Sequence, residues 1–277
     1  MLTGLRSRKH IAPFDLVRPT SIDACLSWLS RGPRIGLMAG GLDLIDRMKF
    51  GQPFDTIVSL SAIPDLAGIR QTDGTIIVGA LTTHAALSRD PLIAETIPDL
   101  ATLWREIANP RVRHTGTVGG NIMSRQPHYD AMPALMALGA TATIADPATG
   151  VRTVAVSELP GDSLLINVII PATGARLFAD RSLHPSVSVY SGATLDSGDV
   201  TELRVAFGGA YPHPRVVDLP AHDLRQSDLA SKAATLAEIA TRYLPEPLTD
   251  GFASAQYRRR MIEVLTRRSL IRLGHSL

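Results

Sequence analysis

Cysteine is nearly absent from this chain. Cys25 is the only cysteine among 277 residues, which excludes an intrachain disulfide. It also excludes an iron–sulfur cluster held by this chain alone, because such a cluster takes about four cysteine ligands. Cys25 lies in the apolar stretch 22–29, so we expect it to be a small buried residue.

Long apolar runs are missing as well. No stretch approaches the roughly 18 apolar residues that a membrane-spanning helix needs. Residues 1–15 contain basic side chains but lack the apolar segment of a secretory signal peptide. We therefore expect a cytoplasmic protein that makes no contact with a membrane.

Neither sign of charge dominates, and several common site motifs are absent. The 28 Lys and Arg residues against 26 Asp and Glu residues give a formal net charge of +2, and no basic tract indicates a nucleic-acid partner. The eight histidines show no zinc-site spacing, so we expect no metal in this chain. The Rossmann fingerprint G-x-G-x-x-G and the P-loop are both missing, so nucleotide binding would use another fold.

What the chain does contain is enough apolar sequence for a sizeable core. Hydrophobic residues make up 45% and charged residues 19%, and the length predicts about two domains. Mixed helices and strands come first, then a few strands, then helices, an order that predicts an α+β fold rather than a doubly wound sheet. The change of pattern places a domain boundary near residues 170–175.

The local patterns predict individual elements. Thr20-Ser21-Ile22-Asp23 resembles a capping box that opens the first helix, and Asp73-Gly74 predicts a hairpin turn. In the last helix, Tyr257, Met261, Val264 and Leu265 form the expected apolar stripe, opposite a basic cluster at 258–260 and 267–268 that is solvated or contacts a partner subunit. The expected helices are 20–31, 42–49, 100–107, 131–138, 229–243 and 254–273, with a short one beginning at 82–84; the expected strands are 34–38, 56–60, 68–70, 75–80, 140–145, 151–156, 164–170, 187–190 and 203–207.

Two double-glycine segments stand out. They are residues 38–44 (MAGGLDL) and 116–122 (GTVGGNI), and each lies where an apolar run turns toward a helix. Glycine permits positive φ and lets a ligand approach the main chain, and N–H groups at the start of a helix attract anions. One such pair is usually only a tight turn. Two of them far apart in sequence suit a ligand with two phosphates, and therefore a dinucleotide.

The residues around these segments resemble a known family. Residues 39–49 resemble the first FAD motif of the flavin-binding subunits of molybdenum hydroxylases, the medium subunits of carbon monoxide dehydrogenase type and the FAD domain of xanthine dehydrogenase. Residues 109–122 are similar to the second, more specific motif of these subunits. Residues 127–135 resemble the segment whose aspartate holds sugar hydroxyls of FAD. Residues 208–214 and 254–259 resemble the C-terminal domain, so the resemblance covers about residues 13–272.

The resemblance implies a fold and a division of the chain. The fold is α+β, with a two-lobed FAD-binding domain of the vanillyl-alcohol-oxidase-like, PCMH type, followed by a small C-terminal domain made of a sheet with helices. The implied limits are residues 1–172 for the FAD-binding domain, with its lobes divided near 52–55, and residues 173–277 for the C-terminal domain.

The resemblance also assigns the cofactor site, while no catalytic residue is identified. The glycines would let the main chain approach the FAD diphosphate, Asn121 would reach a phosphate or the adenosine side, two hydroxyls would add contacts, and Asp130 would accept from sugar hydroxyls. The implied cofactor-binding residues are Met38, Ala39, Gly40, Gly41, Leu42, Asp43, Leu44, Thr117, Gly119, Gly120, Asn121, Ser124, Asp130 and Ile170.

The implied role is electron transfer. Such a subunit takes electrons from a separate [2Fe–2S] subunit, and a third subunit carries the molybdopterin, so the resemblance implies an (αβγ)2 assembly. Three departures from the family pattern concern the flavin ring: Leu42 stands where Thr is usual, residues 158–162 replace a longer loop, and 175–191 lack the usual lysine. Two alternatives stay open, a stand-alone FAD-dependent oxidoreductase of the same fold and a scaffold subunit that has lost FAD.

Overall fold

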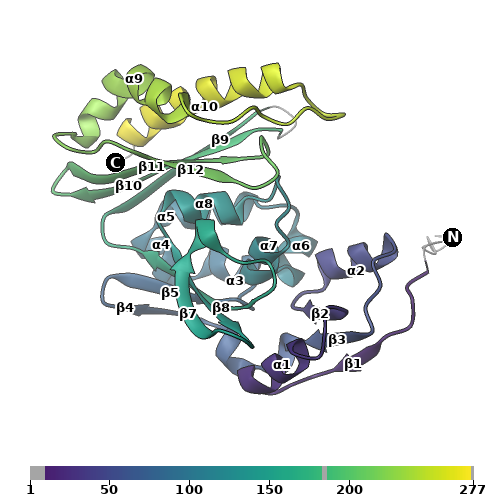
Figure 1. Ribbon diagram of the computed structural model, residues 1–277. Helices are drawn as coiled ribbons and strands as arrows, with labels where there is room; N and C mark the ends of the chain where they lie inside the picture. Colours follow the sequence, from purple (N-terminus) through teal and green to yellow (C-terminus); the bar gives the residue numbers. More distant parts are fainter. Residues whose placement is uncertain (1–9, 183–185, 276–277) are drawn as a thin grey trace, which may run out of the picture.

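The structure is a computed structural model that describes residues 10–182 and 186–275 (Figure 1). Within these residues the strands form three sheets, of three, five and four strands. No helix in the described part of the chain is both long and apolar enough to cross a bilayer. The strands are β1 (Asp15–Val17), β2 (Ile35–Met38), β3 (Thr56–Ser59), β4 (Ile69–Thr72), β5 (Thr75–Gly79), β6 (Thr141–Asp146), β7 (Gly150–Ala155), β8 (Leu164–Pro171), β9 (Ala175–Arg181), β10 (Ser188–Asp196), β11 (Asp199–Gly208) and β12 (Arg215–Leu219).

The helices lie between and outside these sheets. Short ones fill the middle of the molecule, and the two longest lie on its outer side, at the top of Figure 1. They are α1 (Ile22–Leu29), α2 (Leu42–Lys49), α3 (His84–Arg89), α4 (Pro91–Thr96), α5 (Pro98–Glu106), α6 (Pro110–Thr115), α7 (Val118–Met123), α8 (Ala131–Ala137), α9 (Leu229–Thr241) and α10 (Ala255–His275).

The N-terminal sheet is parallel, in the order β1-β3-β2. On one face, Cys25 of α1 packs with Val58, and burial raises the pKa of the Cys25 thiol to about 11, which confirms the expected buried cysteine. On the other face, Leu44 and Met48 of α2 pack with Ile57. Because α2 is held by this apolar contact, the loop that precedes it has a fixed position.

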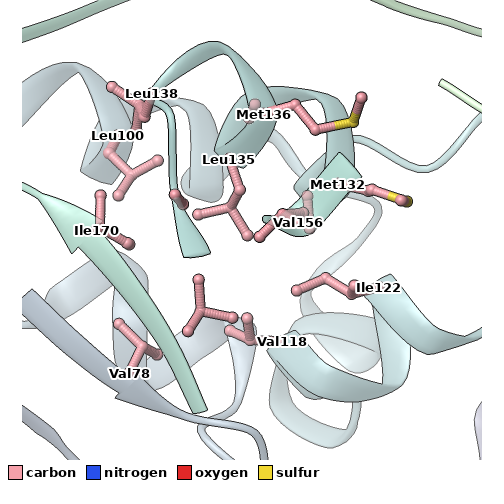
Figure 2. Packing of buried hydrophobic residues seen from close by; sticks show 14 of the residues in the cluster. Val78, Leu100, Val118, Ile122, Met132, Leu135, Met136, Leu138, Val156 and Ile170 are labelled. Carbon is pink, nitrogen blue, oxygen red and sulfur yellow. The ribbon is translucent and has the colours of Figure 1, made fainter. Parts of the chain in front are cut away.

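The five-stranded sheet is antiparallel, in the order β4-β5-β8-β6-β7. Its inner face packs against α3, α4, α5, α7 and α8 in the largest core, which includes Val78 of β5, Val118 of α7 and Leu135 of α8 (Figure 2). Trp104 of α5 is fully buried in the same core. This core fixes α7, which contains the second double-glycine segment.

Helix α8 lies between two sheets. All seven of its residues are buried, and none is charged. The four-stranded sheet, in the order β12-β11-β10-β9, covers its second side, while α9 and α10 cover the far face of that sheet (Figure 1). The approach is close, because a Cβ on Gly192 of β10 would lie 2.1 Å from the carbonyl oxygen of Ala137.

Most of the expected elements are confirmed, with differences that have physical reasons. The cap of α1 is Ser21, whose hydroxyl accepts from the Ala24 N–H at 3.2 Å, so the expected capping box is wrong. Helices α4 and α6 were not expected because six residues are too few to show a 3.6-residue period. Strands β10 and β11 extend well beyond the expected ranges. Strands β9 and β12 were not expected, because their sequences show no clear alternation of apolar and polar residues.

The expected inward face of the last helix is confirmed at Leu265, which is buried, and at Met261, which packs against the core, but it is wrong at Tyr257. Tyr257 is 40% exposed, whereas Arg258, expected on the polar face, is 2% exposed. The Arg258 guanidinium pairs with Asp250 at 2.8 Å and donates to the Leu248 carbonyl at 2.9 Å, so its buried charge is compensated. The inward stripe also includes Ile262, Leu270 and Leu273.

The sheets also bear on the expected lobe boundary. Strand β3 lies at the centre of the N-terminal sheet, so that sheet extends to Ser59, past the boundary near 52–55. Strand β8 ends at Pro171 and β9, the first strand of the last sheet, begins at Ala175. The limits 1–172 and 173–277 stay a prediction.

Candidate cofactor site

The first double-glycine segment connects β2 to α2. Gly41 has φ +79°, in the region that favours glycine, and it occupies the cap position of α2 without any side-chain cap. Its carbonyl accepts from the Ile45 N–H at 2.9 Å. In the described chain, the N–H groups of Gly40, Gly41 and Leu42 donate to no protein acceptor. These free donors at a helix start are suited to an anion such as a phosphate.

The other predicted residues of this segment hold it in place. Leu44 is buried, and Met38 packs against the same small core. The Asp43 carboxylate accepts from the Gln126 amide at 3.3 Å and lies 3.7 Å from Arg47. Leu42 is 42% exposed at the first turn of α2. Asp43 therefore joins the first segment to the chain that follows the second segment.

The second segment differs from the expectation. Gly119 and Gly120 do not have positive φ, because both lie inside α7. The N–H of Gly119 donates to the Ala80 carbonyl at 2.8 Å, and a Cβ on Gly119 would lie 2.7 Å from the Ala80 Cβ. The Gly120 N–H donates to the Thr117 hydroxyl at 3.0 Å. These N–H groups are thus used within the protein, and Gly119 is required for packing against Ala80.

Gly120 faces a different environment from Gly119. A Cβ there would meet only the Thr117 Oγ1 at 2.9 Å and the Ala39 Cβ at 3.9 Å. On the other side of the gap, a Cβ on Gly40 would lie 1.9 Å from the Thr115 carbonyl oxygen. The structure therefore brings the two segments together as the sequence predicted. Outside its two chain neighbours and the backbone of its own helix, no other described atom would lie within 4 Å of a Cβ on Gly120.

Two polar side chains, those of Asn121 and Ser124, follow Gly120 in the chain. The Asn121 Oδ1 is buried and has no hydrogen-bond partner in the described structure. The Ser124 hydroxyl donates to the Asn121 carbonyl at 2.8 Å. A buried carbonyl oxygen without a donor is costly, and a nucleotide offers suitable donors in its sugar hydroxyls and base amine.

Asp130, at the start of α8, contacts the last sheet. Its Oδ1 accepts a hydrogen bond from the Tyr190 hydroxyl of β10 and lies 3.4 Å from Nη2 of Arg181 of β9. Burial, then the Asp130 charge, raises the pKa of Tyr190 well above its ordinary value, so Tyr190 is a neutral donor. Burial disfavours the Arg181 cation, but Asp130, Tyr190 and Glu106 together outweigh this effect and raise the pKa of Arg181.

The side chain of Ile170 is not placed where it could contact a cofactor. Ile170 lies in β8, it is 1% exposed, and its side chain belongs to the largest core (Figure 2). Its backbone pairs with Ile76 of β5. Any contact of Ile170 with a cofactor therefore involves its main chain.

These residues fit a dinucleotide such as FAD. The start of α2 offers free N–H donors, Gly120 leaves space that a side chain would fill, and Asn121 has an unsatisfied buried oxygen. Sequence reasoning missed Gln126, Tyr190 and Arg181, because no local pattern indicates that strands of the last sheet reach Asp130. In the described residues, no group of three or more His, Cys, Asp or Glu side chains is arranged to hold a metal ion.

Comparison with known proteins agrees with this arrangement. Residues 12–173 match the family model described as FAD binding domain in molybdopterin dehydrogenase, and residues 184–273 match CO dehydrogenase flavoprotein C-terminal domain. The carbon monoxide dehydrogenase medium chain of Afipia carboxidovorans is 30% identical, over 94% of this chain and 96% of that protein. The 6-hydroxypseudooxynicotine dehydrogenase complex subunit alpha of Paenarthrobacter nicotinovorans is 28% identical, over 95% of each.

Solved structures give the same result. A chain of quinoline 2-oxidoreductase from Pseudomonas putida 86 superposes with a TM-score of 0.82 at 26% identity, covering 96% of this chain and 98% of that one. The family model of the FAD binding domain covers more than half of the chain, and the two relatives named above align over 94% and 95% of it. The chain therefore belongs to the family of FAD-binding flavoprotein subunits of molybdopterin dehydrogenases.

Proposed function

We propose that this chain binds one FAD without a covalent link and is the medium, electron-transfer subunit of a molybdenum hydroxylase. The observation that carries the proposal is the end-to-end alignment with a carbon monoxide dehydrogenase medium chain, which covers 96% of that protein. The free N–H groups of Gly40, Gly41 and Leu42 and the space above Gly120 support a bound diphosphate.

The residues of this chain bind and orient the cofactor. The start of α2 holds the diphosphate, and the Asn121 Oδ1 accepts from the nucleotide. When bound, flavin takes up one or two electrons, which suits transfer from an iron–sulfur cluster. Buried His84 is kept neutral, with its pKa lowered to about 4 by burial and then by Arg113, so its charge is absent near the second segment at neutral pH.

The partners follow from what the chain lacks. With Cys25 as its only cysteine it cannot hold a cluster alone. We therefore propose a separate [2Fe–2S] small subunit and a molybdopterin large subunit, combined with this chain as (αβγ)2. A cytoplasmic location stays a prediction.

The first experiment tests the cofactor. The purified chain is denatured, and the released flavin is identified chromatographically. We expect all of the flavin in the supernatant, because neither glycine segment carries a His or Cys suited to a covalent link; His114, just before the second segment, is exposed. We expect the released flavin to be FAD and not FMN, because two such segments suit a ligand with two phosphates. Flavin that stays with the precipitated protein would contradict the non-covalent link, and a colourless protein that binds no added FAD would favour the scaffold alternative.

The second experiment tests electron transfer. Anaerobic visible spectra are recorded after addition of the complex's organic substrate, first to the isolated chain and then to the chain mixed with its partner subunits. We expect the flavin absorbance to bleach only in the mixture. Turnover by the isolated chain at the rate of the complex would support the stand-alone oxidoreductase instead.

A further inference from the structure

A buried ionic cluster joins the two halves of the molecule beside the candidate site. Asp130 starts α8, while Arg181 and Tyr190 come from neighbouring strands of the last sheet. The Asp130 side chain is 16% exposed and that of Arg181 27%, and Tyr190 is fully buried. Oδ1 of Asp130 thus accepts a hydrogen bond from the Tyr190 hydroxyl and forms an ion pair with the Arg181 guanidinium.

Arg181 is incompletely satisfied in this cluster. Its Nη2 is buried and makes no hydrogen bond in the described structure, although it lies 3.4 Å from Asp130 Oδ1 as an ion pair. Leaving a buried charged donor without an acceptor costs free energy. A second ion pair between the same two halves, Arg176 with Asp99, has its Nε at 3.1 Å from the carboxylate in hydrogen-bonding geometry. Of these two arginines, only Arg181 has a buried side-chain nitrogen without a hydrogen bond in the described residues.

The position of Arg181 relative to the diphosphate indicates what it meets. Gln126 contacts Asp43 at the start of α2, so the chain passes from the diphosphate at residue 126 to the junction of the two halves at Asp130. A dinucleotide whose diphosphate lies at the start of α2 would reach Arg181 if its other half follows this stretch of chain to Asp130. Ligand sites commonly lie at such junctions between domains.

We propose that Arg181 is a further FAD-binding residue, whose Nη2 donates to an oxygen of the flavin half of the cofactor beside Asp130. This inference rests on the proposed function. The flavin half offers carbonyl and hydroxyl oxygens, and its ring becomes negatively charged on reduction, which a guanidinium stabilises. Residues 175–191 contain no lysine. Of the two arginines in this segment, Arg176 pairs with Asp99, so Arg181 is the cation beside Asp130.

The test compares FAD with ADP, which has the same diphosphate but no flavin. Apo-protein is titrated with FAD by fluorescence quenching and with ADP by competition, for wild type, Arg181→Met and Arg181→Lys. We expect Arg181→Met to raise the Kd for FAD about 10- to 100-fold, the range for a lost charged hydrogen bond. The Kd for ADP should change less than about twofold, and Arg181→Lys should recover part of the FAD affinity.

Arg176→Met is the matched control. It removes the other ion pair between the same strand and the N-terminal half, so it should lower the unfolding temperature of the apo-protein and leave the Kd for FAD unchanged. If Arg181→Met does not fold, Arg181→Gln takes its place, because it is neutral and still forms hydrogen bonds. Wild-type FAD affinity in the Arg181 variant, or an equal loss for ADP, would overturn the inference alone. A wild-type chain that binds no FAD would overturn the proposed function with it.

Discussion

Replacement of Gly120 tests the space between the two double-glycine segments. A Cβ at this position points toward Ala39 and closely meets only the Thr117 hydroxyl, at 2.9 Å. Gly120 lies in α7 without positive φ, so alanine or valine adds no backbone strain. Alanine even favours the helix by about 1 kcal/mol relative to glycine. That gain offsets a cost of about 1 kcal/mol if the Thr117 cap is disturbed, so the apo-protein should keep its stability.

The effect on FAD should be large. The added side chain occupies space that we assign to the diphosphate, and each lost hydrogen bond to a charged oxygen costs about 1.5–3 kcal/mol. We therefore expect the Kd for FAD to rise at least about tenfold for Gly120→Ala and further for Gly120→Val. Flavin fluorescence titration measures the Kd, and thermal unfolding of the apo-protein measures the stability.

Gly119→Ala is the matched control for this prediction. Its Cβ would lie 2.7 Å from the Ala80 Cβ and 2.8 Å from the Ala80 carbonyl oxygen, inside the core. This variant should destabilise the apo-protein by about 1–3 kcal/mol, as overpacking does. FAD bound by Gly120→Val with wild-type affinity would refute the assignment of the space to the diphosphate.

Two further predictions concern stability. His84, whose pKa is lowered to about 4 by burial and then by Arg113, takes up a proton more readily when unfolded, so up to about 3 kcal/mol of stability present above pH ~6.5 should be lost as the pH falls toward 4. Urea unfolding between pH 7 and 4 should show a steeper loss in wild type than in His84→Asn, and parallel curves would contradict this. Gly192→Ala should lower the free energy of unfolding by about 1–3 kcal/mol because its Cβ meets the Ala137 carbonyl. Gly251→Ala, at an open position, is its control in thermal unfolding, and equal melting temperatures would be the contrary result.

The sequence predicted the local structure of the two glycine segments best where neighbouring residues decide it. Gly41 takes the positive φ that a turn before a helix often needs, and the motif resemblance located both segments. Prediction from the sequence failed where contacts with other parts of the chain decide which residues are buried. Nothing around Gly119 indicates that its neighbour is Ala80, and nothing around Arg258 indicates that Asp250 permits its burial. The partners of Asp130 were missed for the same reason.

The fold class was easier to predict than the element lengths. The order of apolar patterns along the chain indicates α+β without any knowledge of tertiary contacts. The length of a strand such as β11 (Asp199–Gly208) depends on its neighbours on both sides, since backbone pairing with β10 and β12 extends it into residues of low strand propensity.

Helix α8 has a consequence for the way the chain folds during synthesis. Its seven residues carry no charge and are buried between the two larger sheets. When the N-terminal part has been made, one side of α8 already has its sheet, but the other side faces water until β10 and β11 follow. During that interval the ribosome-bound chain exposes an apolar surface, which is the kind of surface that chaperones bind and that causes aggregation. Production of the protein should therefore depend on the speed at which its C-terminal part is completed.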